Sequence, residues 1–110
     1  MIDVVVEQRV VVVLGRGPIE DDPSRSVARA AERGIPLVVL TLGYPATDGQ
    51  QAFVERAIDA AFATRVHLDA RIVSQPGGLA EHIGASDDVT VVASGREQRQ
   101  IGSGLARRSR

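Results

Sequence analysis

The fold is decided by residues 10–42, which read "VVVVLGRGPIEDDPSRSVARAAERGIPLVVLTL". The stretch begins and ends with runs of β-branched and other apolar residues, 10–14 and 36–42, that are typical of parallel strands buried on both faces. Between them, Asp22 and the proline after it can start a helix, and Gly34 suits the left-handed residue that follows one. A strand, a helix and a second strand in this order predict one right-handed unit of a parallel sheet.

The rest of the chain repeats this alternation. A second helix is expected over 48–63 and a short third helix over 77–84. Two further strands are expected at 67–73 and 89–93, and the first of these alternates polar with apolar residues, which suits an edge strand. The sequence therefore predicts one α/β domain, residues 1–110, with a three-layer, Rossmann-like open parallel sheet of about four strands and helices on both faces.

The second helix is expected to bury an apolar face against the sheet. That face combines Val54, Ile58, Ala61 and Phe62, and it is widened by Phe53 and Ala57. Because large aromatic side chains usually fill a core, the two phenylalanines, Phe53 and Phe62, are both predicted to be buried.

Composition excludes several classes of function. The chain has no cysteine, which removes disulfides and thiolate chemistry, and all 13 basic residues are arginine, so a lysine Schiff base and a lysine-containing phosphate loop cannot occur. A formal net charge of -1 argues against a general nucleic-acid binder. No apolar run reaches the length of a membrane span, and the start of the chain lacks the features of a secretory signal. We therefore expect a cytoplasmic protein with no nucleic-acid or membrane partner.

Catalytic and metal motifs are also missing from the sequence. No Gly-x-Ser-x-Gly elbow occurs, and His67 and His82 have no acidic partner at a recognisable spacing. Glu81 and His82 are adjacent on a predicted helix and project about 100° apart, so they do not form a metal face. The dinucleotide fingerprint lacks its third glycine. We expect a protein that is not an enzyme and has no metal site of its own.

Glycine-containing loops follow each predicted strand, at the sheet edge where open parallel sheets bind ligands. The first loop holds Gly15 and Gly17, and the last is "ASGREQRQIGSG", residues 93–104. Glycines before a helix can present several backbone N–H groups to an anion. In the last loop, Ser103 precedes the expected terminal helix "LARRSR", so it can either cap that helix or donate to a phosphate.

The order of these segments resembles the universal stress protein family. The similar stretches are "VVVLGRGPIEDDPSRSVARAAERG" with "IPLVVLTL", then "ARIVSQPGGLAEHIGASDDVTVVASG", and finally "GSGLARRSR". The resemblance implies the strand order 3-2-1-4 and a regulatory domain in the stress response. It also implies an adenine nucleotide, ATP or AMP, at the carboxyl edge of the sheet, with Mg²⁺ only as the ion that accompanies the nucleotide.

The binding residues implied by the resemblance lie in the first and last loops. Gly15 or Arg16 stands where the family has an aspartate, and only six residues separate Gly95 from Gly102 where the family pattern Gly-x2-Gly-x9-Gly-Ser/Thr has a longer loop. The candidate cofactor-binding residues are Gly15, Arg16, Gly17, Ser94, Gly95, Gly102 and Ser103.

Two features leave a second interpretation open. The family's usual fifth strand is missing, so an edge of the sheet is expected to be exposed, and a partner chain in a homodimer or the segment "MIDVVVE", residues 1–7, could cover it. Residues 1–7 would either extend the first strand or form an edge strand of their own. The alternative function is a degenerate member that has lost the nucleotide site and acts as an oligomerisation or protein-interaction module.

Overall fold

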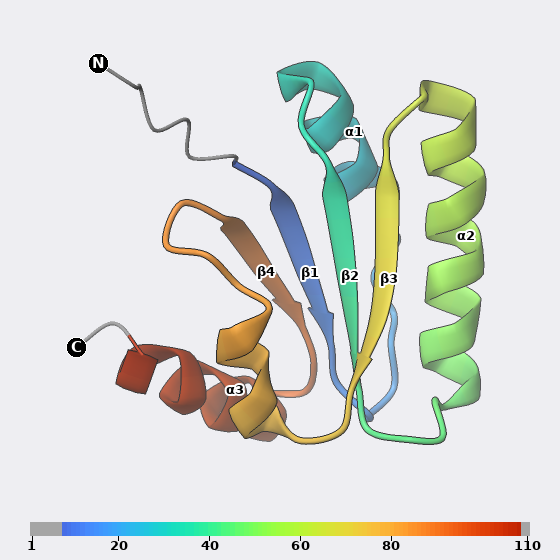
Figure 1. Cartoon of the computed structure of the whole chain (residues 1–110). Helices are drawn as coiled ribbons and strands as arrows, with labels where there is room; N and C mark the ends of the chain where they lie inside the picture. The colour runs from blue at the N-terminus through green and yellow to red at the C-terminus, as the bar shows by residue number, and fades with distance from the viewer. Residues whose placement is uncertain (1–7, 109–110) are drawn as a thin grey trace, which may run out of the picture.

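The computed structural model describes residues 8–108, with side chains described as far as residue 102. Four parallel strands form one sheet: β1 (Val10–Leu14), β2 (Leu37–Leu42), β3 (Leu68–Val73) and β4 (Asp88–Val92). Their order is β3-β2-β1-β4, as the resemblance implied (Figure 1). The expected roles of residues 1–7 lie outside the described part of the chain.

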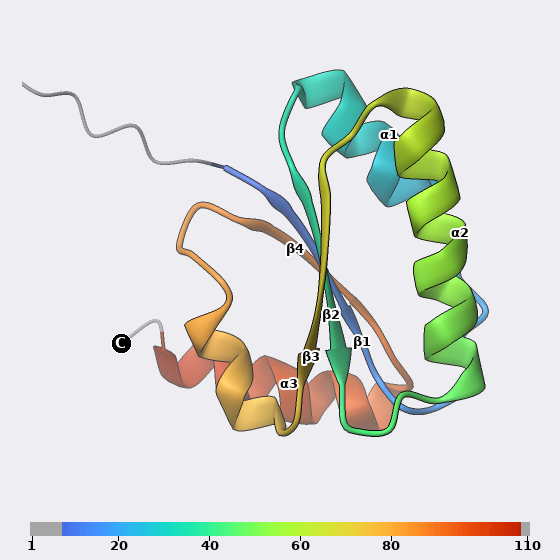
Figure 2. The same ribbon diagram turned by 45° about the vertical axis from the view of Figure 1, so that its right-hand side comes forward.

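Helices cover both faces of the sheet, which gives the predicted three-layer α/β fold (Figure 2). On one face lie α1 (Ser24–Arg33) and α2 (Asp48–Thr64). On the other lie η1, a 3-10 helix (Pro76–Glu81), and α3 (Gly95–Arg108). Each face of the sheet therefore has a core of its own.

Strand β1 lies at the centre of both cores. All five of its residues have no exposed surface. Val10, Val12 and Leu14 belong to the core under α1 and α2, whereas Val11 and Val13 belong to the core under η1 and α3. Side chains alternate between the faces of a strand, so an unbroken apolar run is what a strand covered on both faces requires.

Hydrogen bonds and backbone conformation define the ends of α1 and the start of α2, and at Gly34 they match the prediction. Gly34 ends α1 in the left-handed conformation, with φ of 64°. Before α1, the Asp22 Oδ1 atom accepts a hydrogen bond of 2.7 Å from the backbone N–H of Ser24. At the start of α2, Thr47 and Gln50 form a reciprocal capping box, in which each side chain accepts a hydrogen bond from the other residue's backbone N–H.

The prediction that Phe62 and Ile58 are buried is wrong. Phe62 is 88% exposed and Ile58 is 48% exposed, while Phe53 is only 1% exposed. The sheet buries a different row of α2, made of Gln50, Phe53, Ala57 and Ala61. Phe62 follows Ala61 and projects about 100° away from it, so it lies outside the core.

The segment expected to be a loop after the fourth strand is helical. Helix α3 begins at Gly95 and contains Gly102, so the predicted terminal helix starts about ten residues earlier than expected. Its residues include good helix formers, and Ile101, which is 1% exposed, anchors it against the second core. The expected helix over 77–84 is the 3-10 helix η1, which ends at Glu81.

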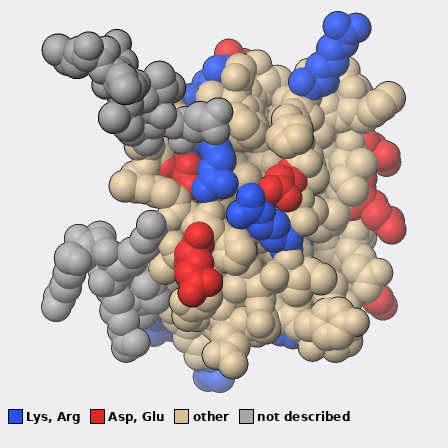
Figure 3. Space-filling view, in the orientation of Figure 1, with Lys and Arg blue, Asp and Glu red and all other residues tan. Residues whose placement is uncertain are grey.

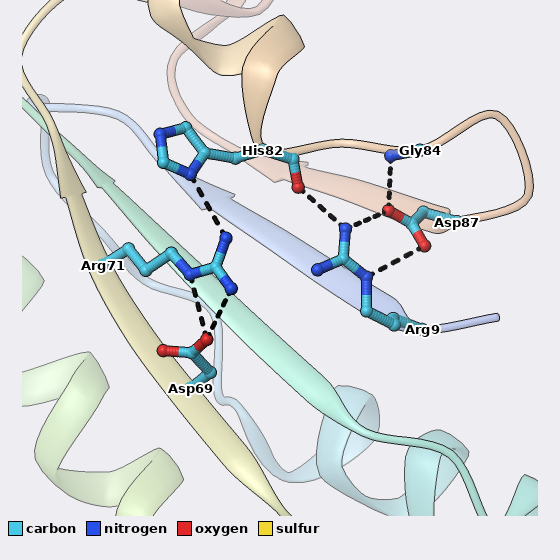
Figure 4. A network of polar contacts seen from close by, with 6 residues as sticks. All are labelled: Arg9, Asp69, Arg71, His82, Gly84 and Asp87. Carbon is cyan, nitrogen blue, oxygen red and sulfur yellow. Dashed lines mark hydrogen bonds and ion pairs between the residues drawn. The ribbon is translucent and has the colours of Figure 1, made fainter. Parts of the chain in front are cut away.

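A polar network joins the residue before β1 to the loop before β4, on the face of the sheet that η1 and α3 cover (Figure 4). Arg9 Nε and Nη2 donate to the two carboxylate oxygens of Asp87 at 3.2 and 2.6 Å, and Nη2 also donates to the backbone carbonyl of His82 at 2.8 Å. The backbone N–H of Gly84 donates to Asp87 at 2.7 Å. On the face seen in Figure 3, acidic and basic side chains lie beside one another. The loop before β4 is thereby held to the start of β1.

Candidate functional site

The loop after β1 meets the first turn of α3 at the carboxyl edge of the sheet. The backbone N–H of Arg16 donates to Glu97 Oε2 at 2.6 Å, and that of Gly17 donates to Glu97 Oε1 at 2.8 Å. Two consecutive backbone N–H groups therefore converge on one carboxylate. Successive N–H groups of this kind form a concave binding site for anions.

Glycine at positions 15 and 17 allows the carboxylate to approach this closely. A Cβ atom at Gly15 would lie 2.7 Å from both Ala93 Cβ and Glu97 Oε2, and one at Gly17 would lie 2.9 Å from Glu97 Oε1. These distances are shorter than ordinary contacts between non-bonded atoms. The close packing of the loop against Glu97 therefore depends on the absence of side chains here.

We expect Gly15→Ala to lower the free energy of unfolding by about 1–2 kcal/mol, since the added methyl group must displace Ala93 or Glu97. Urea denaturation measures the change. Gly77→Ala is the matched control, because nothing lies within 4 Å of the added carbon there, and it should shift stability by less than about 0.5 kcal/mol. Equal stability of the two variants would contradict the close packing at Gly15.

Glu97 is held as an anion. Burial raises the pKa of its carboxyl group, but the hydrogen bonds from the backbone of Arg16 and Gly17 outweigh burial and leave the pKa below its ordinary value. Ser94 Oγ adds a longer contact of 3.4 Å to Glu97 Oε1. The carboxylate also lies in the first turn of α3, where the helix dipole favours a negative charge. The group bound by the loop is therefore a carboxylate ion at neutral pH.

The Arg16 side chain joins the first loop to the second. Its Nη1 donates to the carbonyl of Leu42 at 3.1 Å, and its Nη2 donates to that of Pro45 at 2.9 Å. Gly43 permits this arrangement, because its φ of 86° suits glycine and a side chain there would meet the Arg16 guanidinium. A cation thus lies at the carboxyl edge of β2, next to the loop that binds Glu97.

Gln50 binds the same two loops, those after β1 and β2, from the first turn of α2. Its buried Nε2 atom lies within hydrogen-bond distance of three backbone carbonyls, those of Leu14, Gly15 and Leu42, at 3.2, 3.0 and 2.9 Å. Sequence reasoning missed this residue. The capping-box spacing from Thr47 to Gln50 was a signal that could have drawn attention to it.

A cavity of about 160 Å³ opens beside Glu97. Its lining combines the first two loops with η1 and α3, and consists of Arg16, Leu42, Gly43, Ser74, Pro76, Glu97, Gln100 and Ile101. A larger cavity of about 460 Å³ lies on the other face of the sheet, between the start of α1 and β4, and its lining includes Asp21 and Asp22. Arg25 also lines this cavity, so its charged lining is mixed.

The structure brings together four of the seven predicted site residues. Gly15, Arg16, Gly17 and Ser94 surround the Glu97 carboxylate. Gly95 is the first residue of α3, and Gly102 and Ser103 lie within the helix. Gly102 lies seven positions after Gly95 in the helix, a rise of about 10 Å, so their N–H groups do not converge as the expected loop required. The Ser103 side chain lies outside the described part of the structure.

Glu97 lies at the centre of the candidate site, and sequence reasoning did not single it out. It lies about 80 residues from its partners along the chain, and no motif connects them. Side chains of His, Asp and Glu in residues 8–108 form no group of three or more that could hold a metal ion. Within the same range, no helix has the length and apolar character needed to span a membrane.

Comparisons with protein-family models, with curated proteins and with solved structures found no match to this chain. The geometry defines an open parallel α/β domain in which two backbone N–H groups at the carboxyl edge of the sheet bind the carboxylate of Glu97.

Proposed function

We propose that the chain is a regulatory domain of the universal stress type, which binds the phosphate of ATP or AMP at the carboxyl edge of its sheet. The observation that carries this proposal is that the backbone N–H groups of Arg16 and Gly17 hold an anion at the end of β1. Phosphate oxygens bind to the same kind of donors, and this edge is where open parallel sheets take their ligands. The proposed role is binding and regulation in the cytoplasm, without catalysis.

The phosphate and Glu97 compete in this proposal. Both are negatively charged and use the same two N–H groups, so they do not occupy the loop together. Glu97 also lines the cavity of about 160 Å³, which is smaller than the roughly 300–1,000 Å³ of typical ligand sites. Withdrawal of Glu97 both frees the donors and enlarges the cavity. The Arg16 guanidinium is close enough to the edge to add a positive charge beside the phosphate.

Glu97→Ala is expected to raise the affinity for ATP and AMP at least about tenfold, which corresponds to about 1.4 kcal/mol, because it removes the competing carboxylate. Isothermal titration calorimetry with and without Mg²⁺ measures the affinity. Glu32→Ala is the control, since Glu32 is exposed on α1 and its loss changes net charge equally. The control should bind as weakly as the unaltered protein.

Absence of binding by both the unaltered protein and Glu97→Ala at millimolar nucleotide would overturn the proposal, provided that both proteins are folded by circular dichroism. Equal gains in affinity from Glu97→Ala and Glu32→Ala would show a general charge effect instead of competition in the loop.

A second candidate function is a protein-interaction module without a nucleotide. The specific observation in its favour is that the described residues expose large hydrophobic side chains, among them Ile58, Phe62 and Ile72. In this role Glu97 permanently takes the place of a ligand and fixes the loop after β1. A protein that stays monomeric at high concentration and binds no other protein would contradict this candidate.

A further inference from the structure

Strand β3 forms one of the two edges of the sheet, and β4 forms the other. Figure 2 looks toward the β3 edge, with α2 on one side of it and η1 with α3 on the other. The carbonyls of His67 and Val73 accept hydrogen bonds of 2.9 and 2.8 Å from the β2 side. Successive residues of a strand point their backbone groups to opposite sides, so the N–H and C=O groups of Leu68, Ala70 and Ile72 point outward.

The side chains of β3 differ between its two faces. On the face of η1, Arg71 donates to Asp69 Oδ2 through Nε and Nη2, at 2.9 and 2.7 Å (Figure 4). On the face of α2, Ala70 is exposed and Ile72 is 54% exposed. The edge therefore carries one negative and one positive side chain on one face and small or apolar side chains on the other.

We propose that two copies of this chain associate through this edge, with their β3 strands antiparallel about a twofold axis at Ala70. In this register Ala70 lies opposite Ala70 of the second copy, and Leu68 lies opposite Ile72. All three outward-pointing residues of each strand then form hydrogen-bonded pairs, two bonds to a pair. Asp69 lies opposite Arg71 of the second copy, and Arg71 lies opposite its Asp69, so four charges alternate in sign.

The charges select this register over its neighbours. A twofold axis perpendicular to the sheet pairs only residues that lie on the same face, so the next possible registers are centred on Asp69 or on Arg71. The first places two Asp69 carboxylates directly opposite each other, and the second does the same with two Arg71 guanidinium groups. Like charges in directly opposite positions are destabilising.

Helix α2 adds an apolar surface beside the edge. Val54, Ile58 and Phe62 are spaced by four residues and share one side of the helix. A groove of about 330 Å³ lies between α2 and β3, and both Val54 and Ile72 line it. The same twofold axis brings a second, antiparallel α2 alongside the first. The exposed Ile58, Phe62 and Ile72 therefore lie on the side of the domain that faces the second copy.

Charge reversal tests the register. Sedimentation or light scattering should give twice the chain mass of 11.7 kDa for the unaltered protein. Asp69→Arg and Arg71→Asp should each be monomeric, because each places like charges opposite one another. Mixing the two variants should restore a dimer, since their charges are complementary. Glu32→Arg on α1 is the control and should remain dimeric.

A cysteine cross-link tests the axis. The unaltered chain has no cysteine. Opposed residues of a hydrogen-bonded pair have Cα atoms about 5.5 Å apart, within reach of a disulfide, so Ala70→Cys should form a covalent dimer on mild oxidation. Ile72→Cys should not, because the two copies of this residue lie about 13 Å apart along the strands.

A monomeric unaltered protein at a concentration of 1 mM would overturn the proposal, as would a dimer whose mass is unaffected by either charge reversal. Failure of the two folded charge variants to associate when mixed would overturn the register. All of these masses are measured without nucleotide, so their outcome is independent of binding at the carboxyl edge. A second copy of this chain would be the partner of the interaction module, and the two copies can associate whether or not the chain binds a nucleotide.

Discussion

Gln50→Ala is expected to lower the free energy of unfolding by about 3 kcal/mol, as measured by urea denaturation. The substitution removes the donor shared by three buried carbonyls, and an unsatisfied buried group costs about 1–3 kcal/mol. It also removes half of the capping box at the start of α2, which is worth about 1 kcal/mol. Because the same side chain fixes the loops after β1 and β2, the hydrogen bonds to Glu97 should weaken as well.

Gln51→Ala is the matched control, because this neighbouring glutamine is exposed and its side chain donates a hydrogen bond to the carbonyl of Ala46 at 3.1 Å. Its loss should cost less than about 0.5 kcal/mol. Gln50→Glu keeps the length of the side chain but loses the N–H donors. Its free energy of unfolding should therefore be almost as low as that of Gln50→Ala. Equal costs at positions 50 and 51 would show that the three carbonyl contacts contribute nothing.

Asp87→Ala is also expected to lower the free energy of unfolding by about 3 kcal/mol. The Asp87 side chain is only 2% exposed, and its loss removes a carboxylate that accepts two hydrogen bonds from the partly buried Arg9 guanidinium. Asp88→Ala removes the next carboxylate along the chain, which bonds at 3.2 Å to Arg29 and Arg33 nearer the surface. That control should cost less than about 1 kcal/mol. Equal costs would contradict the dominant role of the buried pair.

The contribution of Asp87 should disappear in acid. Burial raises its pKa, but hydrogen bonds from Arg9 and Gly84 outweigh burial and hold the pKa below its ordinary value. As pH falls, the unfolded chain therefore takes up the proton first, near its ordinary pKa of about 3.9, and the free energy of unfolding decreases until the folded group is protonated too. Stability measured between pH 6 and pH 2 should fall less steeply for Asp87→Asn than for the unaltered protein. Part of the dependence of stability on pH should remain in Asp87→Asn, because the pKa of Glu97 is also lowered.

The strands were predictable because their signal is local. A residue in β1 is apolar whichever face it points to, so five successive apolar residues identify a covered strand without knowledge of its neighbours. The alternating pattern of β3 likewise identified an edge strand. Helix punctuation at Gly34 depends on one residue and its backbone conformation, and it was also read correctly.

The candidate site was only partly predictable, because its contacts join distant segments. Gly15 and Gly17 could be selected from their place after β1, whereas Glu97 is one of 14 acidic residues and nothing nearby in the sequence singles it out. The glycine and serine at 102 and 103 suggested a loop, but burial of Ile101 favoured a helix through them. Phe62 was misplaced because α2 carries apolar residues on two of its sides and only packing decides which side is buried.

The central position of β1 also determines when the sheet can be completed as the chain is synthesised. Val10 pairs with Leu37 on one side and with Asp88 on the other. Its first neighbour is therefore made soon after it, whereas its second neighbour is made only after α2, β3 and η1. Until then an apolar strand has one open edge and one uncovered face, and such a surface is prone to association with other unfinished chains. The last two elements of the domain, β4 and α3, are thus the ones that end this exposure.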